Sequence, residues 1–65
     1  MAMRVVKLVE VIDKTGLSRS SIYAFIADGR FPKPLPLGDR RVGWLESEVE
    51  DWIQARLAMR DQGIQ

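Results

Sequence analysis

A turn followed by a capped helix, within residues 15–30, is the feature that most constrains how this chain can fold. Gly16 favours the left-handed backbone conformation in which helices end. Ser18 suits the start of the next helix, because its hydroxyl can accept hydrogen bonds from free backbone N–H groups of the first turn. The apolar side chains that follow at helical spacing are Ile22, Phe25 and Ile26. The pattern predicts a helix over about 18–28 with one buried face.

Two further helices are predicted, one on each side of this segment along the chain. The first covers about 7–15, and the second covers about 47–61, where Ser47 and Glu50 have the spacing of a capping box. The apolar stripe of helix 7–15 is Leu8, Val11 and Ile12. The apolar stripe of helix 47–61 is Val49, Trp52, Ile53 and Leu57.

Three prolines interrupt the chain between the second and third predicted helices. Pro32, Pro34 and Pro36 cannot donate backbone hydrogen bonds and favour extended neighbours, so no helix crosses this region. Residues 38–41 read as a turn between extended pieces at 35–37 and 42–44. We therefore expect a mainly α protein with a small β-hairpin wing over about 35–44. This is a three-helix winged helix-turn-helix, forming a single domain over residues 1–65.

The composition excludes several classes of function. The chain has 65 residues and contains neither Cys nor His, so thiolate and imidazole metal sites and histidine general bases are absent. We expect no enzyme activity, no cofactor, no metal and no small-molecule substrate. No apolar run approaches the roughly 20 residues of a membrane span, so we expect no membrane partner and a cytoplasmic location.

The charges are divided unevenly along the chain, although the formal net charge is only +1. Residues 14–41 carry six basic and two acidic side chains, whereas residues 42–65 carry two basic and five acidic ones. The first part can attract a polyanion, and the second part repels one.

Arg19, Ser20 and Tyr23 are the candidate residues for reading double-stranded DNA, because they lie opposite the inward stripe of the second helix. Arg can donate two hydrogen bonds to guanine, Ser suits base edges or phosphate, and a Tyr hydroxyl commonly meets phosphate. Arg40 and Arg41 at the expected wing tip could bind phosphate or enter a minor groove. Further candidates for backbone contacts are Lys14, Arg30 and Lys33.

Other interpretations of the same residues favour structural roles or a different partner. Aromatic side chains could stack on single-stranded bases, but in so small a chain they fit a core better; they are Phe25, Phe31, Trp44 and Trp52. The carboxylates Glu48, Glu50 and Asp51 suit the first turn of a helix. An alternative of another class is a small interaction adaptor or antirepressor that docks through Ala55, Ala58 and Met59.

Four spaced motifs carry a resemblance to a known family. They are LSRSSIY at 17–23, GRFPKP at 29–34, Arg40 with VGW at 42–44, and SEV at 47–49 with WI at 52–53. The chain resembles the AlpA family of prophage regulatory proteins, which is related to excisionase-like and MerR-like winged helix-turn-helix domains. The likeness extends from about residue 4 to residue 60.

The resemblance implies a sequence-specific DNA-binding transcriptional regulator of a prophage or mobile element. In this reading helix 18–28 enters the major groove and wing 35–44 contacts the backbone or the minor groove. An excisionase-like architectural factor in recombination is the alternative, because it would use the same surface. Ala24, Ala27 and Asp39 depart from the more basic pattern of such proteins. A single module of this size binds weakly, so we expect several copies of the chain on tandem or inverted sites. The protein, of bacterial or phage origin, is expected in the cytoplasm in association with the nucleoid.

Overall fold

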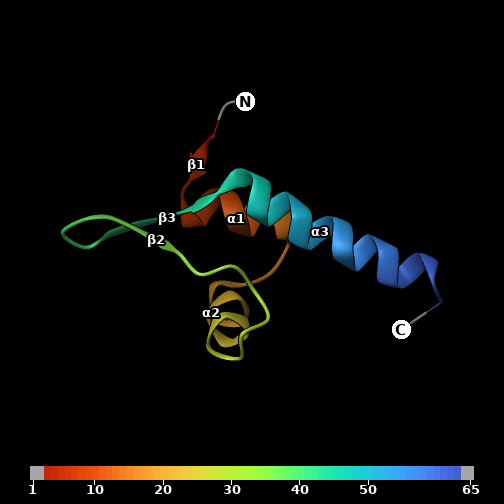
Figure 1. Ribbon diagram of the computed structural model, residues 1–65. Coiled ribbons are helices and arrows are strands. Elements are labelled where there is room, and N and C mark those ends of the chain that lie inside the picture. Colours follow the sequence, from red (N-terminus) through yellow and green to blue (C-terminus); the bar gives the residue numbers. More distant parts are fainter. Residues whose placement is uncertain (1–2, 64–65) are drawn as a thin grey trace.

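Three helices and a three-stranded sheet make up the computed structural model, which describes residues 3–63 (Figure 1). The elements in chain order are β1 (Val5–Val6), α1 (Leu8–Thr15), α2 (Arg19–Ala27), β2 (Leu35–Gly38), β3 (Arg41–Leu45) and α3 (Glu46–Asp61). The mainly α fold with a hairpin wing is confirmed. Residues 1–2 and 64–65 of the expected domain lie outside the described residues.

The turn between α1 and α2 forms as its residues predict. Gly16 has φ +73°, and its N–H donates to the Ile12 carbonyl at 2.8 Å, which closes the end of α1. Thr15 Oγ1 donates to the Val11 carbonyl at 2.8 Å and accepts from the Leu17 N–H at 3.2 Å. Ser18 Oγ then accepts from the Ser21 N–H at 3.1 Å and caps α2.

The sheet has the order β1-β3-β2, and both pairings are antiparallel. Val6 pairs with Trp44 on one side of β3, and Leu35 pairs with Gly43 on the other. The two residues of β1 are too few to show a strand period, so the sequence gives no sign of this strand. In the wing, a register irregularity lies between Pro36 and Gly38.

Gly43 fills a position in the sheet that has no room for a side chain. A Cβ atom there would lie 2.5 Å from Val5 Cγ1, 3.0 Å from Leu37 Cδ1 and 3.2 Å from the Val6 carbonyl oxygen. The close approach of β1 and β2 on either side of β3 therefore depends on glycine at this position.

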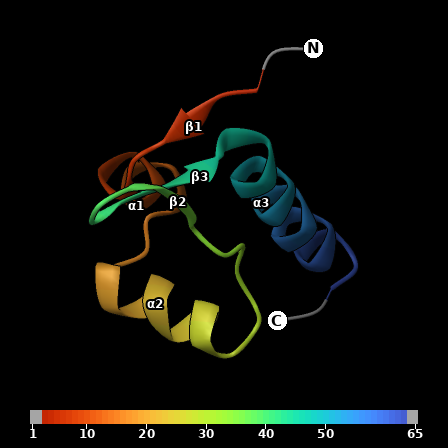
Figure 2. The ribbon, with the colours of Figure 1, turned by 60° about the vertical axis from the view of Figure 1, so that its left-hand side comes forward.

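Trp44 is the largest fully buried side chain of the core. The hydrophobic side chains buried with it are Val6, Val11, Ile22, Phe31 and Val49. Phe25 and Trp52 pack against them as partly buried side chains. The prediction that the four aromatic residues belong to the core is confirmed. Figure 2 shows the three helices arranged around the sheet that contains Trp44.

The start of α3 differs from the prediction. The helix begins at Glu46 directly after β3, and its N-cap is Leu45, which makes no side-chain capping bond. The Glu46 N–H donates to the Arg4 carbonyl at 2.7 Å, so pairing with the N-terminal segment continues up to the first helical residue. The predicted capping box at Ser47 is therefore wrong, because Ser47 already lies inside the helix.

The C-terminal half of α3 extends beyond the rest of the molecule (Figure 1). Leu57, which was expected on the buried stripe, is 39% exposed. Among residues 3–63, no helix is both long enough and apolar enough to cross a membrane.

Replacing the two serines by alanine should separate the real cap from the apparent one. We expect Ser18→Ala to lower the free energy of unfolding by about 1 kcal/mol, because it removes the hydroxyl that caps α2. Ser47→Ala should change it by less than about 0.5 kcal/mol, as surface substitutions usually do. Urea unfolding followed by circular dichroism measures both, and equal losses would contradict the assignment of the caps.

Adding one methyl group at Gly43 should destabilise the sheet. We expect Gly43→Ala to cost about 1–3 kcal/mol of unfolding free energy, because its Cβ overlaps the Val5 side chain. Val5→Ala removes Cγ1 and should recover part of this loss in the double variant. Strictly additive losses in the two single variants and the double variant would show that the Val5 contact is not the cause.

Candidate nucleic-acid interface

The outer face of α2 presents polar side chains from the first two turns of the helix. Ile22 is fully buried, which turns the opposite side of the helix toward solvent. Arg19 and Ser20 are exposed, and Tyr23 lies at the edge of this face beside the sheet, where it is 38% exposed. The structure thus brings together the three residues that were predicted to read DNA. Ala24 and Ala27 continue this face and are also exposed.

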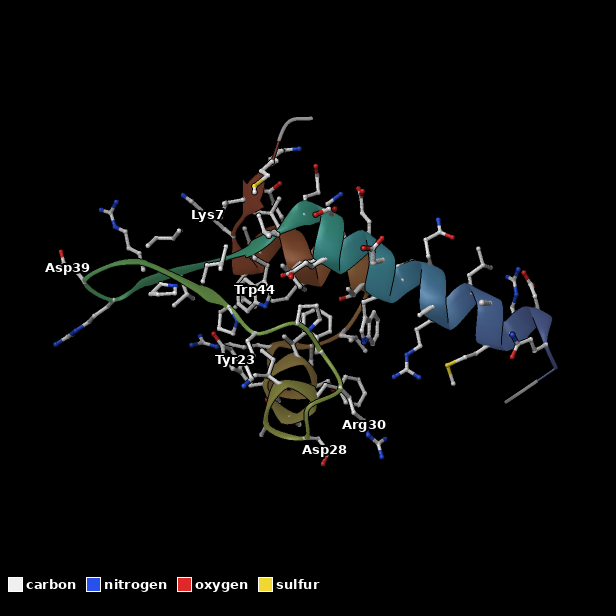
Figure 3. The ribbon with its side chains drawn as sticks, viewed as in Figure 1. Lys7, Tyr23, Asp28, Arg30, Asp39 and Trp44 are labelled. Carbon is white, nitrogen blue, oxygen red and sulfur yellow. The ribbon has the colours of Figure 1, made fainter. Side chains whose placement is uncertain are left out.

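The exposed residues of α2 are connected to the core through aromatic contacts. The Arg19 guanidinium carbon lies 5.8 Å from the centre of the Tyr23 ring. The Tyr23 ring meets Trp44 of β3 edge to face, with centroids 6.4 Å apart and planes inclined by 68°. Figure 3 shows Tyr23 on the side of α2 that faces the sheet, next to Trp44.

The wing tip carries two arginines next to a carboxylate. Asp39 takes a left-handed conformation with φ +42°, which a short polar side chain tolerates, and Gly38 precedes it with φ +117°. Asp39 marks the end of the wing in Figure 3. Arg40 and Arg41 follow it, and both are exposed. Neither makes an ion pair within residues 3–63.

The two wing arginines lie in different parts of the wing, Arg40 in the turn and Arg41 at the start of β3. Arg41 shares a sheet face with Gly43, and that face points toward Val5 and Leu37, whereas Trp44 faces the core. Arg41 lines an open hollow together with Lys7, Leu37 and Val42. Sequence reasoning missed Lys7, because only the pairing of β1 with β3 brings it beside the wing. Arg40 belongs to the turn itself.

Arg30 and Lys33 lie in the segment that connects α2 to the wing. The Arg30 Nε lies 3.0 Å from Asp28 Oδ2 at the C-terminal end of α2 (Figure 3). Lys33 is exposed two residues before β2 begins. The backbone of the segment is held from α3, because Trp52 Nε1 donates to the Arg30 carbonyl at 2.6 Å.

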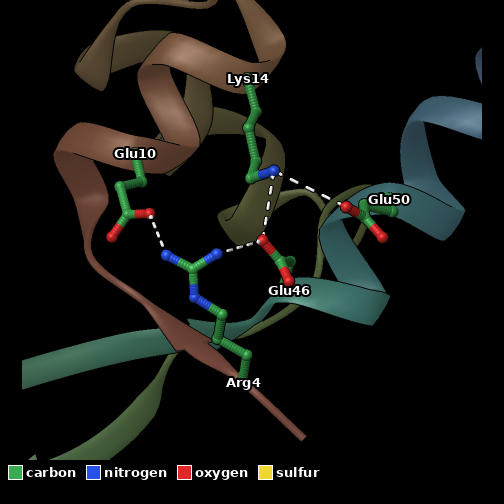
Figure 4. Close-up of polar contacts among 5 residues, drawn as sticks. All are labelled: Arg4, Glu10, Lys14, Glu46 and Glu50. Carbon is green, nitrogen blue, oxygen red and sulfur yellow. Dashed lines mark hydrogen bonds and ion pairs between the residues drawn. The ribbon is translucent and has the colours of Figure 1, made fainter. Parts of the chain in front are cut away.

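Lys14 lies apart from these residues, in a cluster of ion pairs between α1, α3 and Arg4, the residue before β1. Its Nζ is 3.3 Å from Glu46 Oε2 and 3.6 Å from Glu50 Oε2 (Figure 4). Arg4 completes the cluster, with contacts of 3.1 Å to Glu46 and 3.3 Å to Glu10. The acidic start of α3 thus engages Lys14, which leaves the cations of α2, the connecting segment and the wing exposed to solvent.

Comparison with known proteins extends over most of the chain. The family model of the prophage CP4-57 regulatory protein (AlpA) matches residues 4–57. An uncharacterized protein, ORF88, of Enterobacteria phage P4 is 45% identical over 60 residues, which cover 92% of this chain and 68% of that protein. The DNA-binding transcriptional activator AlpA of Escherichia coli (strain K12) is 39% identical over 61 residues, covering 85% of this chain and 87% of that protein. The chain described here therefore belongs to the AlpA family of prophage regulatory proteins.

Proposed function

We propose that this protein is a sequence-specific DNA-binding regulator of transcription in a prophage or mobile element. In this proposal α2 enters the major groove of double-stranded DNA, and the wing formed by β2 and β3 contacts the backbone or the minor groove. The protein acts in the bacterial cytoplasm, at the nucleoid. The description of the Escherichia coli relative as a DNA-binding transcriptional activator supports the same class of function.

The observation that carries the proposal is the outer face of α2. An α-helix fits the width of the major groove, and its first turn adds backbone N–H donors and a partial positive charge that favour nearby phosphate. Arg19 and Ser20 lie in this first turn and are free of competing carboxylates within residues 3–63. Arg19 can therefore offer its guanidinium to the acceptor atoms of guanine.

The remaining cations are assigned to the phosphate backbone according to their places in the fold. Arg40 at the wing tip and Lys33 in the connecting segment are exposed and can neutralise phosphates beside the groove. Arg30 can also bind a phosphate if its guanidinium leaves Asp28, with which it forms an ion pair in this structure. Arg41 is proposed to contact a phosphate from the face of β3 opposite to Trp44. Lys14 holds α1 against α3 in this proposal, since its ammonium group already faces two carboxylates.

Several copies are expected to act together on one regulatory region. A single module of this size buries only about 600–1,000 Å² on DNA, which gives limited affinity. Binding of further copies of the chain to tandem or inverted sites would raise the occupancy of the region.

Removing the Arg19 side chain should weaken the preference for the correct sequence. We expect Arg19→Ala to cost about 1–3 kcal/mol of binding free energy on target DNA, because a bidentate base contact is lost, and to affect unrelated DNA much less. Fluorescence anisotropy with duplexes from the region upstream of the gene and its neighbours measures both values. Arg60→Ala is the matched control, since Arg60 pairs with Asp61 at the distal end of α3. Equal affinities of the two variants would remove Arg19 from the interface.

Removing Arg40 should change the salt dependence rather than the sequence preference. We expect Arg40→Ala to weaken binding to all duplexes by a similar factor. It should also reduce the slope of log affinity against log salt concentration by about one, because one phosphate is no longer neutralised. Titrations at several salt concentrations measure the slope. An unchanged slope, or one that falls equally in Arg60→Ala, would place the wing tip away from the DNA.

A further inference from the structure

Three side chains form a continuous series from the solvent-exposed face of α2 to the core. Arg19 lies over the ring of Tyr23, and that ring meets Trp44 edge to face. Trp44 is fully buried, and its Nε1 donates to the Pro32 carbonyl at 3.0 Å. The innermost member of the series is thus fixed by both packing and a hydrogen bond.

The spacing of Arg19 and Tyr23 brings their side chains together on one helical face. Residues four apart on an α-helix are neighbours on its surface, and a guanidinium above an aromatic face is attracted by the electron density of the ring. Within residues 3–63, Arg19 has no carboxylate partner. With no ion pair to draw it elsewhere, the guanidinium is favoured in its position over the Tyr23 ring.

The ring of Tyr23 makes these contacts, and its hydroxyl does not. The ring bridges Arg19 and Trp44. No hydrogen bond of the hydroxyl occurs in the part of the chain that the structure describes. A side chain held in place before binding loses less conformational freedom when it meets its partner. The ring can thus affect DNA recognition without touching a base.

We infer that Tyr23 is a positioning residue for sequence recognition, whose ring holds the Arg19 guanidinium in place for base contact. The inference rests on the proposed function, in which Arg19 reads a base in the major groove. It assigns the effect of Tyr23 on sequence preference to the ring, in place of the phosphate contact by the hydroxyl that the sequence suggested.

The test compares Tyr23→Phe and Tyr23→Leu, each with Arg19 intact and with Arg19→Ala. Wild-type protein first selects a target from a random duplex library, and the base pair at which Arg19→Ala loses discrimination is identified. Anisotropy then gives the affinity of every variant for the target and for a duplex changed at that base pair. Thermal unfolding by circular dichroism tests whether each variant is folded, which is needed because the Tyr23 ring packs against Trp44.

We expect Tyr23→Phe to keep the wild-type preference at this base pair and the wild-type salt slope. Tyr23→Leu should lower the preference about 2–5-fold, the range that an exposed cation–π contact provides. Arg19→Ala should cost correspondingly less in the Leu background, because the two side chains act as one unit.

Two results would overturn the inference while leaving the proposed function intact. One is a loss in Tyr23→Phe as large as that in Tyr23→Leu, which would make the hydroxyl the functional group. The other is independence of the Arg19 and Tyr23 effects. If Tyr23→Leu does not fold, Tyr23→Phe still decides between ring and hydroxyl. Failure of the wild-type protein to select any sequence would instead overturn the proposed function together with the inference.

Discussion

The burial of Trp44 in the central strand is the interaction on which the other elements depend. Its strand β3 pairs with β1 on one side and with β2 on the other, and leads directly into α3. A buried indole needs an acceptor for its N–H, and the Pro32 carbonyl supplies it at 3.0 Å. Because Pro32 lies between α2 and the wing, this bond fixes the path of the connecting segment. Tyr23 packs against the same indole, so α2 is placed relative to the sheet by the same residue.

A second indole holds the same segment from the side of α3. Trp52 Nε1 donates to the Arg30 carbonyl at 2.6 Å, and its ring meets Phe31 at a centroid distance of 5.0 Å. Arg56 covers the outer side of Trp52, with its guanidinium carbon 4.8 Å from the ring centre. Carbonyls two residues apart are thus bound by tryptophans from two different elements. The helix and the wing that are proposed to contact DNA are joined by a segment whose backbone is held at both points, so a small domain can present both parts in one relative orientation.

The charge distribution along the chain and the charge distribution on the surface are different. Counted by position, Lys14 belongs to the basic part of the sequence. The fold places it against Glu46 and Glu50, where Arg4 also converges. These ion pairs are partly exposed, so they contribute little to stability. They bring the acidic start of α3 next to Lys14 of α1 and to Arg4, away from the exposed cations of α2 and the wing.

Features governed by neighbours in sequence were determined by the sequence itself. The left-handed end of α1 at Gly16, the cap of α2 at Ser18 and the exclusion of helix by the prolines each depend on the conformational limits of one residue or one hydrogen bond across a few residues. Only the tertiary structure decided the strand β1, the start of α3 at Glu46, the engagement of Lys14 and the exposure of Leu57. The physical reason is that these four features depend on hydrogen bonds, charges and packing between residues far apart in the chain. A local sequence pattern does not identify such distant partners.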